Sequence, residues 1–176
     1  SLKLFTSFWS GCIFIIVYLL IASVSIGFWI AFPALSLGLF LCVSIYHFAS
    51  DWRDAAPIYA RLCLASIVLC GPAVFHSMTL INVFGALLLT ETQARVIILL
   101  MRSLFAVTTV IFAVFFIYRV ASKQYIKENR WRVAEYIVLL TSSLMLTPLL
   151  HFGLYFCALH SPKHMLDVGQ QLMLNF

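Results

Sequence analysis

Long apolar runs separated by short polar segments dominate the chain. From Leu4 to Ser50 there is no Lys, Arg, Asp or Glu. A helix that crosses a bilayer needs about 20 apolar residues, so this stretch alone has room for two such helices. The pattern predicts a first helix over 8–30 and a second that begins at Pro33 and runs to about residue 50, because proline is tolerated in the first turn of a helix.

The apolar runs that follow predict four more helices, over 57–70, 74–90, 91–118 and 131–160. The division within 57–90 rests on Gly71-Pro72, since proline lacks an N–H and clashes with the preceding turn. Ser161-Pro162 resembles a cap and the first position of a final helix. The expected fold is all-α, a polytopic integral membrane bundle of about six transmembrane helices. It forms a single membrane domain over 1–176, interpreted as an internal fragment of a longer chain because no Met opens it and it ends within an apparent helix.

Composition supports this class of protein. Hydrophobic residues make up 64% of the chain and charged residues 10%, and the mean hydropathy is +1.06. Soluble domains contain about 25% charged residues, so an ordinary soluble enzyme is excluded. The net charge of +5 does not indicate a nucleic-acid partner, because the eleven Lys and Arg form no basic stripe interleaved with aromatic residues.

The distribution of positive charge predicts an orientation. The loop 119–132 holds five Lys and Arg and a single Glu, and the positive-inside rule places such a loop in the cytoplasm. Counting six helices from there places the loop 51–56 and His160 on the non-cytoplasmic face. The expected location is the cell membrane, crossed several times, with the lipid bilayer as a partner.

Histidines are the main ionisable residues within the apolar runs, where such residues are costly and are candidates for function. His47 lies near the end of the second predicted helix, and Asp51 follows one turn later on the same face. The Asp51 carboxylate could accept a hydrogen bond from the imidazole, as the partners of metal-bound histidines do. The alternative is a histidine at the membrane interface beside a surface aspartate.

A second candidate is the sequence H-S-P-K-H, which contains His160 and His164. Spacing of four would place both imidazoles on one face of an unbroken helix, but Pro162 lies between them. We therefore expect the pair to straddle a junction between helices and to converge with His47. Neutral imidazoles with few carboxylates suit iron or zinc; a pair of interfacial histidines is the alternative.

Two further histidines have open or structural interpretations. His76 follows the predicted break and could either line a cavity that binds substrate or bond a freed backbone carbonyl. His151 lies nine residues before His160, half a turn out of phase on a straight helix, which indicates a hydrogen bond between helices. Aromatic residues beside the histidines could line an elongated apolar substrate pocket; they include Tyr46, Tyr155 and Phe156.

Two charged residues receive structural interpretations. Arg102 lies within the predicted helix 91–118, where its guanidinium could reach the interface by snorkelling. Glu135 falls in the first turn of the predicted helix 131–160, where a carboxylate suits the helix dipole.

Three segments together resemble the Brp/Blh family of membrane-bound β-carotene cleavage enzymes. They are Ser44–Trp52 (S-I-Y-H-F-A-S-D-W), Pro72–His76 (P-A-V-F-H) and Pro148–His164, which contains H-F-G-L-Y-F-C-A-L-H-S-P-K-H. The chain departs from the family's usual residues at Ala49, in place of Gly, and at Lys163, in place of Arg. His151 is an additional histidine.

The resemblance implies a non-haem iron dioxygenase that uses O₂ to cleave the central double bond of β-carotene, giving two molecules of all-trans-retinal. It implies Fe(II) as cofactor, with His47, His160 and His164 as ligands and a further ligand in an upstream P-H-G segment that this chain lacks. Asp51 would support these ligands. Retinal is a product that a microbial rhodopsin would take up.

Two other classes of function remain open from the residues alone. A haem-binding membrane cytochrome subunit would use paired histidines of facing helices as axial ligands. A membrane transporter would use His76 and the broken helix as its binding site.

Overall fold

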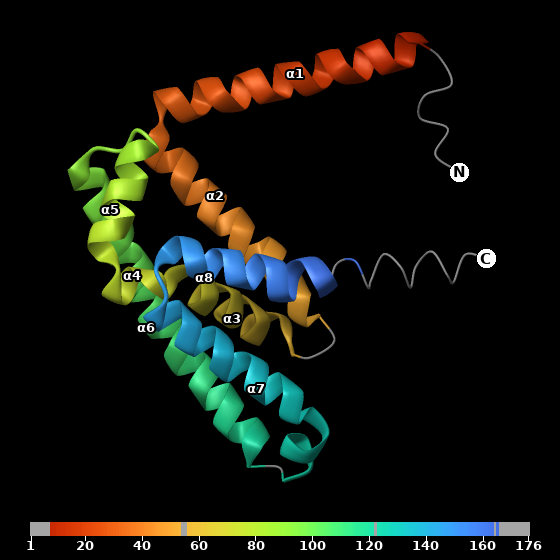
Figure 1. Cartoon of the computed structure of the whole chain (residues 1–176), viewed down its shortest axis with the longest axis vertical. Coiled ribbons are helices and arrows are strands. Elements are labelled where there is room, and N and C mark those ends of the chain that lie inside the picture. The colour runs from red at the N-terminus through yellow and green to blue at the C-terminus, as the bar shows by residue number, and fades with distance from the viewer. Residues whose placement is uncertain (1–7, 54–55, 122, 164, 166–176) are drawn as a thin grey trace.

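The computed structural model describes residues 8–53, 56–121, 123–163 and 165, with the backbone alone for residue 8 and for 123–132. Within these residues every regular element is helical (Figure 1). The elements are α1 (Phe8–Ala31), α2 (Pro33–Phe48), the 3₁₀ turn η1 (Ala49–Trp52), α3 (Ile58–Cys70), α4 (Pro72–Phe75), α5 (Ser77–Ala86), α6 (Glu91–Val120), α7 (Lys123–Met145), α8 (Pro148–Tyr155) and the π-helical turn η2 (Phe156–His160). The all-α fold is confirmed.

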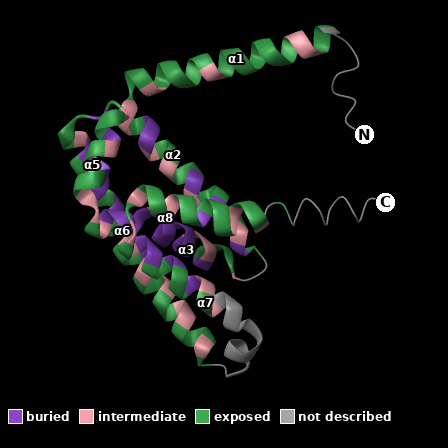
Figure 2. Cartoon of the chain, in the orientation of Figure 1, coloured by how far each residue is buried: buried purple, intermediate pink, exposed green. Residues whose placement is uncertain are grey.

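The first helix, α1, extends away from the other helices (Figure 1), and almost all of its residues are exposed (Figure 2). Its end is attached through Trp29, whose indole Nε1 donates to the Leu87 carbonyl oxygen at 3.2 Å. The turn predicted before Pro33 is present, with Phe32 outside the helical region at φ −136° and ψ 62°. A helix that is apolar on every side and unburied by protein suits a lipid environment.

The break predicted at Gly71-Pro72 lies instead at His76. Gly71 keeps helical dihedrals (φ −53°, ψ −45°), so the chain continues helically through Pro72 to Phe75. His76 leaves the helical region at φ −113° and ψ 35°, and α5 begins at the next residue. The second helix of this stretch is therefore α5, shorter than the predicted 74–90.

Gly71 has a packing role that the sequence did not indicate. A Cβ at this position would lie 2.6 Å from the Ser143 Cβ and 2.8 Å from the Ile67 carbonyl oxygen. Only glycine therefore allows α3 and α7 to approach each other this closely. Gly85, in α5, has open space around its equivalent position.

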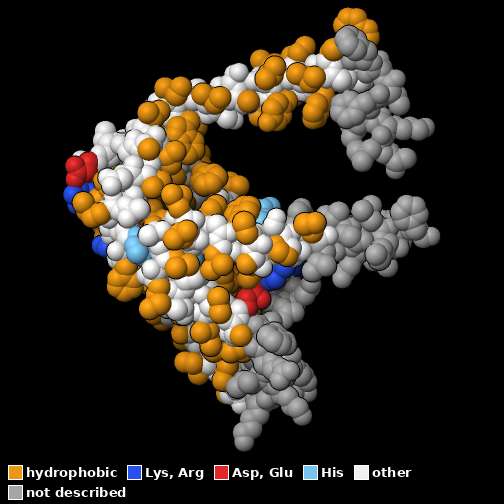
Figure 3. Space-filling view, viewed as in Figure 1, with side chains coloured by type: hydrophobic (Ala, Val, Ile, Leu, Met, Phe, Trp, Pro, Cys, Tyr) orange, Lys and Arg blue, Asp and Glu red, His pale blue; other side chains and the backbone are white. Residues whose placement is uncertain are grey.

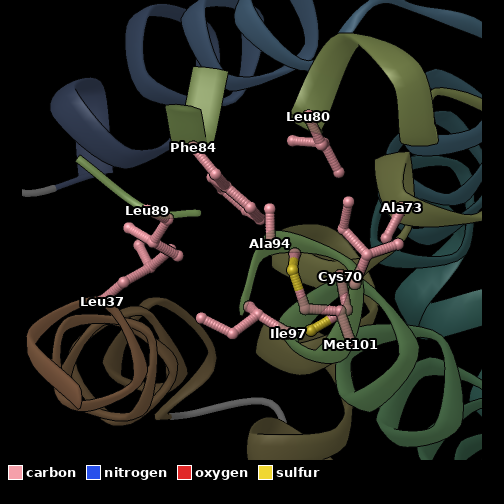
Figure 4. Packing of buried hydrophobic residues seen from close by; sticks show 10 residues of the cluster. Leu37, Cys70, Ala73, Leu80, Phe84, Leu89, Ala94, Ile97 and Met101 are labelled. Atoms are coloured by element: carbon pink, nitrogen blue, oxygen red, sulfur yellow. The ribbon is translucent and has the colours of Figure 1, made fainter. Parts of the chain in front are cut away.

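Helices α3 to α5 together form one interrupted traverse beside α6. The Tyr59 and Phe115 rings lie 5.9 Å apart near one end, and Arg102 bonds the Ala73 carbonyl further along. The helix α6 matches the predicted 91–118, and a capping box formed by Thr90 and Gln93 fixes its start. Ten buried residues of α2 to α6 and the turn before α6 form the core here (Figure 4): Leu37, Cys70, Ala73, Leu80, Phe84, Leu89, Ala94, Ile97, Ile98 and Met101.

The single helix predicted over 131–160 is wrong, because the chain reverses direction before Pro148. Thr147 is extended (φ −59°, ψ 152°), the conformation that a following proline imposes. His151 then lies beside Ser142, and Lys163 beside Glu135, so α7 forms an antiparallel hairpin with the C-terminal helix, which consists of α8, η2 and residues 161–163. No new helix begins at Ser161-Pro162, since Ser161 is helical at φ −61° and ψ −48° and continues the preceding turn.

These two differences compensate in the topology. The stretch 57–90, predicted to cross the membrane twice, forms a single traverse. The stretch 131–160, predicted to cross once, forms a hairpin. His160 and η1 therefore lie at the same end of the bundle. It is the end where α6 finishes, because Tyr59, near the start of α3, packs on Phe115, near the end of α6. This is the side of the loop 119–132, opposite to the face predicted by counting.

Within the described part of the chain, four helices are long and apolar enough to cross a membrane: Trp9–Ala31, Pro33–Trp52, Ile58–Phe75 and Glu91–Val120. Two shorter apolar helices are Ser77–Ala86 and Val133–Met145. The expected number of about six is therefore approximate.

Candidate metal centre

The site begins where α2 ends. His47 lies in the last turn of α2, after which the chain tightens into η1. The Ser50 hydroxyl donates to the His47 carbonyl oxygen at 2.6 Å, which satisfies one of the carbonyls that a helix end leaves unpaired. This tight turn places Asp51 one turn beyond His47.

His47 and His160 are neighbours, although 113 positions separate them in the sequence. Their ring centroids lie 5.2 Å apart at an interplanar angle of 65°. Phe48 and Phe156 pack against His160, with centroids at 5.2 and 4.9 Å. The His160 side chain is only 12% exposed, whereas His47 is exposed on the surface of the bundle.

The Asp51 carboxylate orients His160. Both of its oxygens lie 3.0 Å from His160 Nδ1, and Oδ2 also accepts from the Tyr155 hydroxyl at 2.5 Å. Because a carboxylate accepts, Nδ1 carries the proton and a metal would bind Nε2. The predicted recipient of this support was His47, but the bond is to His160. We call His47, Asp51, Tyr155 and His160 the carboxylate corner.

A π-helical turn makes this arrangement possible. Tyr155 and His160 are five residues apart, a spacing that does not share a face on a regular α-helix. In η2 the Ser161 N–H bonds the Phe156 carbonyl, five residues back, so the turn is one residue wider. Both side chains consequently reach the same carboxylate.

The third predicted ligand, His164, lies outside the described residues. Among the residues that are described, no group of three or more His, Cys, Asp or Glu could hold a metal ion. The carboxylate corner thus provides two of the three predicted imidazoles, one of them already aligned by a carboxylate. Two neutral imidazoles with a carboxylate behind them fit a borderline ion such as iron, as part of its donor set.

The residues predicted to bind substrate are distributed differently. Tyr46 is 72% exposed on α2, next to His47, and Phe156 contacts His160 directly. Tyr155 is buried to 1% exposure and bonded to Asp51, so it supports the site from behind. His76 lies at the interruption between α4 and α5, with its buried Nε2 lacking a hydrogen-bond partner within the described part of the chain.

A second polar cluster surrounds that interruption. Pro72 cannot donate to the Val68 carbonyl, and His151 Nε2 does so instead at 2.9 Å. His151 Nδ1 lies 3.2 Å from the Ser142 hydroxyl, so the predicted hydrogen bond between helices is confirmed. We call Pro72, His76, His151 and Arg102 the helix break.

Arg102 does not snorkel to the interface as predicted. Its guanidinium donates to the Ala73 and Val74 carbonyls at 2.8 and 3.0 Å, and to the Ser77 hydroxyl at 2.5 Å. The end of α4 at His76 frees these carbonyls, and Arg102 satisfies them.

Glu135 is a residue of the site that the sequence interpretation missed. It lies well inside α7, which begins at Lys123, so its predicted place in a first turn is wrong. Its Oε1 accepts from Trp52 Nε1 at 2.7 Å and from Lys163 Nζ at 2.8 Å. The scarcity of acidic residues could have indicated it, since the chain has only six Asp and Glu.

The chain is helical, several of its helices could cross a membrane, and a carboxylate supports its histidine pair. These features place it in the class of membrane proteins with a candidate metal centre. The family model described as beta-carotene 15,15'-dioxygenase matches residues 1–174, so the chain belongs to that family. No curated protein and no solved structure matches the chain.

Proposed function

We propose that this chain forms part of an iron-dependent membrane dioxygenase that cleaves β-carotene at its central double bond, giving two molecules of all-trans-retinal. The observation that carries the proposal is the contact between His47 and His160, with Asp51 on His160 Nδ1, in a chain of this family. His164 is the third proposed ligand.

The proposed reaction needs no oxidant other than O₂. The central carbon–carbon double bond and the O–O bond break, and each of the two carbons receives one oxygen atom as an aldehyde. Iron(II), when bound, would supply the activation of O₂. His47 and His160 would hold the iron, and Asp51 would keep the His160 ring and its tautomer fixed.

The surroundings of the histidine pair suit a long apolar substrate. His47 and Tyr46 are exposed on α2, and Phe156 lies against His160, so the pair is accessible from an aromatic, apolar surface. Hydrophobic side chains predominate over the described surface seen in Figure 3. A carotenoid dissolved in the bilayer would reach this surface directly. Its central bond would be held next to the imidazoles, beside the aromatic rings of Tyr46 and Phe156.

The haem and transporter alternatives have less support. Membership of a dioxygenase family favours carotenoid oxidation over both.

The proposal is tested with the full-length protein, β-carotene and isotopically labelled O₂, both with Fe(II) and with chelator. We expect two retinal molecules per β-carotene consumed, label in both aldehydes, and loss of product with chelator. His47→Ala should lose product formation at matched protein abundance, whereas Cys42→Ala on the same helix should retain it. Undiminished retinal formation by His47→Ala, or cleavage away from the central bond, would contradict the proposal.

A further inference from the structure

Behind the carboxylate corner, one carboxylate joins three elements of the chain. Glu135 on α7 accepts from Trp52 in η1 and from Lys163 in the C-terminal helix. Lys163 Nζ also lies 3.3 Å from the Asp51 carbonyl oxygen and 5.3 Å from the centroid of the Trp52 ring. The two residues that contact Glu135 therefore also contact, or adjoin in sequence, Asp51.

The surroundings make these contacts stronger than an ordinary surface ion pair. Trp52 is 1% exposed, and the Glu135 and Lys163 side chains are 21% and 33% exposed. Hydrogen bonds between charged groups are short and strong when water is largely excluded. Loss of either partner would leave the other charge without compensation in an apolar bundle.

We propose that Glu135 and Lys163 are positioning residues of the candidate metal centre. They hold η1 against the C-terminal helix, so that the Asp51 backbone is fixed and its carboxylate stays aligned with His160 Nδ1. Among the described residues, neither side chain has a contact with His47 or His160; both act through Trp52 and Asp51. The inference rests on the proposed function, because it assigns these residues a role in the metal centre proposed there.

The test uses the full-length protein in detergent, first freed of metal and then titrated with Co(II) as a probe. Glu135→Gln and Lys163→Gln should increase amide hydrogen exchange in 49–53 before metal is added. They should weaken Co(II) binding by about 10–100-fold, the effect typical of residues that support ligands. Lys163→Arg should restore binding to within about threefold. Glu91→Gln, which breaks an exposed ion pair with Arg95, is the matched control and should change neither measurement.

The outcomes separate this inference from the proposed function. Unchanged Co(II) affinity in Glu135→Gln would overturn the positioning role, even if thermal stability fell, because it would show a purely structural ion pair. Unchanged exchange in 49–53 would overturn it as well. A wild-type protein that binds no Co(II) would overturn the proposed metal centre, and this result would not depend on any variant. Hydrogen exchange then still decides whether Glu135 holds η1 in place.

Discussion

The carboxylate corner and the helix break are both polar clusters of an apolar bundle, but their histidines donate hydrogen bonds to different kinds of acceptor. At the helix break, His151 and Arg102 donate to backbone carbonyls that Pro72 and the end of α4 leave unpaired. At the carboxylate corner, His160 and Tyr155 donate to a side-chain carboxylate. The bonds from His151 and Arg102 to backbone carbonyls stabilise an interrupted helix. The bond from His160 to Asp51 instead fixes an imidazole ring next to that of His47. We therefore expect the hydrogen-bond partner of a histidine, rather than the histidine itself, to distinguish a ligand from a structural residue in this protein.

The largest expected effect comes from His160→Ala compared with His151→Ala. We expect His160→Ala to lower retinal formation by more than about 100-fold, because it removes a proposed ligand rather than a residue that supports one. His151→Ala should keep substantial activity and lose at most about 1–2 kcal/mol of stability through its broken hydrogen bonds. Extracted retinal is quantified at matched membrane abundance. Equal inactivation of the two variants would remove the distinction between the clusters.

Asp51→Asn sharpens the comparison within the carboxylate corner. The amide keeps the size of the side chain but removes the charge that holds His160 Nδ1–H, so metal affinity should fall by about 10–100-fold. Iron content and Co(II) titration measure this. Thermal unfolding is the control, and a loss of folding that matches the loss of metal would assign Asp51 to the fold instead.

Much of the helical pattern was accessible from the sequence, and the reasons for the failures are physical. Long apolar runs predict α1, α2 and α6, the first two without a single charge, because a helix satisfies its own backbone hydrogen bonds in an apolar environment. Pro72 was read as a break, yet the helix passes through it since His151, 83 positions away from Val68, satisfies the freed carbonyl. Pro148 was overlooked within an apolar run and reverses the chain.

The site was predictable in its members more than in its contacts. Local spacing singled out His47, Asp51 and His160, which the structure brings together, but it paired Asp51 with its neighbour in sequence. The observed partner, His160, is 109 positions away, and only the packing of the C-terminal helix on η1 brings it there. The contacts of Glu135 are equally long-range.

Gly71→Ala tests the fold around the helix break without touching its polar groups. The added methyl would overlap Ser143 and the Ile67 carbonyl, so we expect a loss of about 1–3 kcal/mol in stability. Gly85→Ala, where the same methyl meets open space, should be neutral or stabilising by up to about 1 kcal/mol. Thermal denaturation in detergent compares the two; an equally stable Gly71→Ala would show that α3 and α7 pack less closely than described.

Arg102→Met should have the smallest effect. It keeps the length of the side chain but leaves the Val74 carbonyl without the Arg102 donor, whereas the Ala73 carbonyl still accepts from the Ser77 hydroxyl. We expect a cost of about 1–2 kcal/mol. Metal affinity and retinal formation per folded molecule should stay within about threefold of wild type. The thermal midpoint and Co(II) titration are measured together. A large loss of metal affinity at normal stability would connect the helix break to the site.

The π-helical turn η2 also bears on how the length of the chain relates to the site. A π turn accommodates one more residue than an α turn, so Tyr155 and His160, five apart, face Asp51 as residues four apart would on a regular helix. A chain with one residue fewer between Phe156 and Leu159 could form a regular α turn and still direct both side chains to one carboxylate. A deletion within α8 would instead rotate everything that follows by about 100° relative to α7. A one-residue deletion among related chains should therefore be tolerated at η2 and excluded from α8, and alignments anchored on a fixed tyrosine–histidine spacing would overlook equivalent sites.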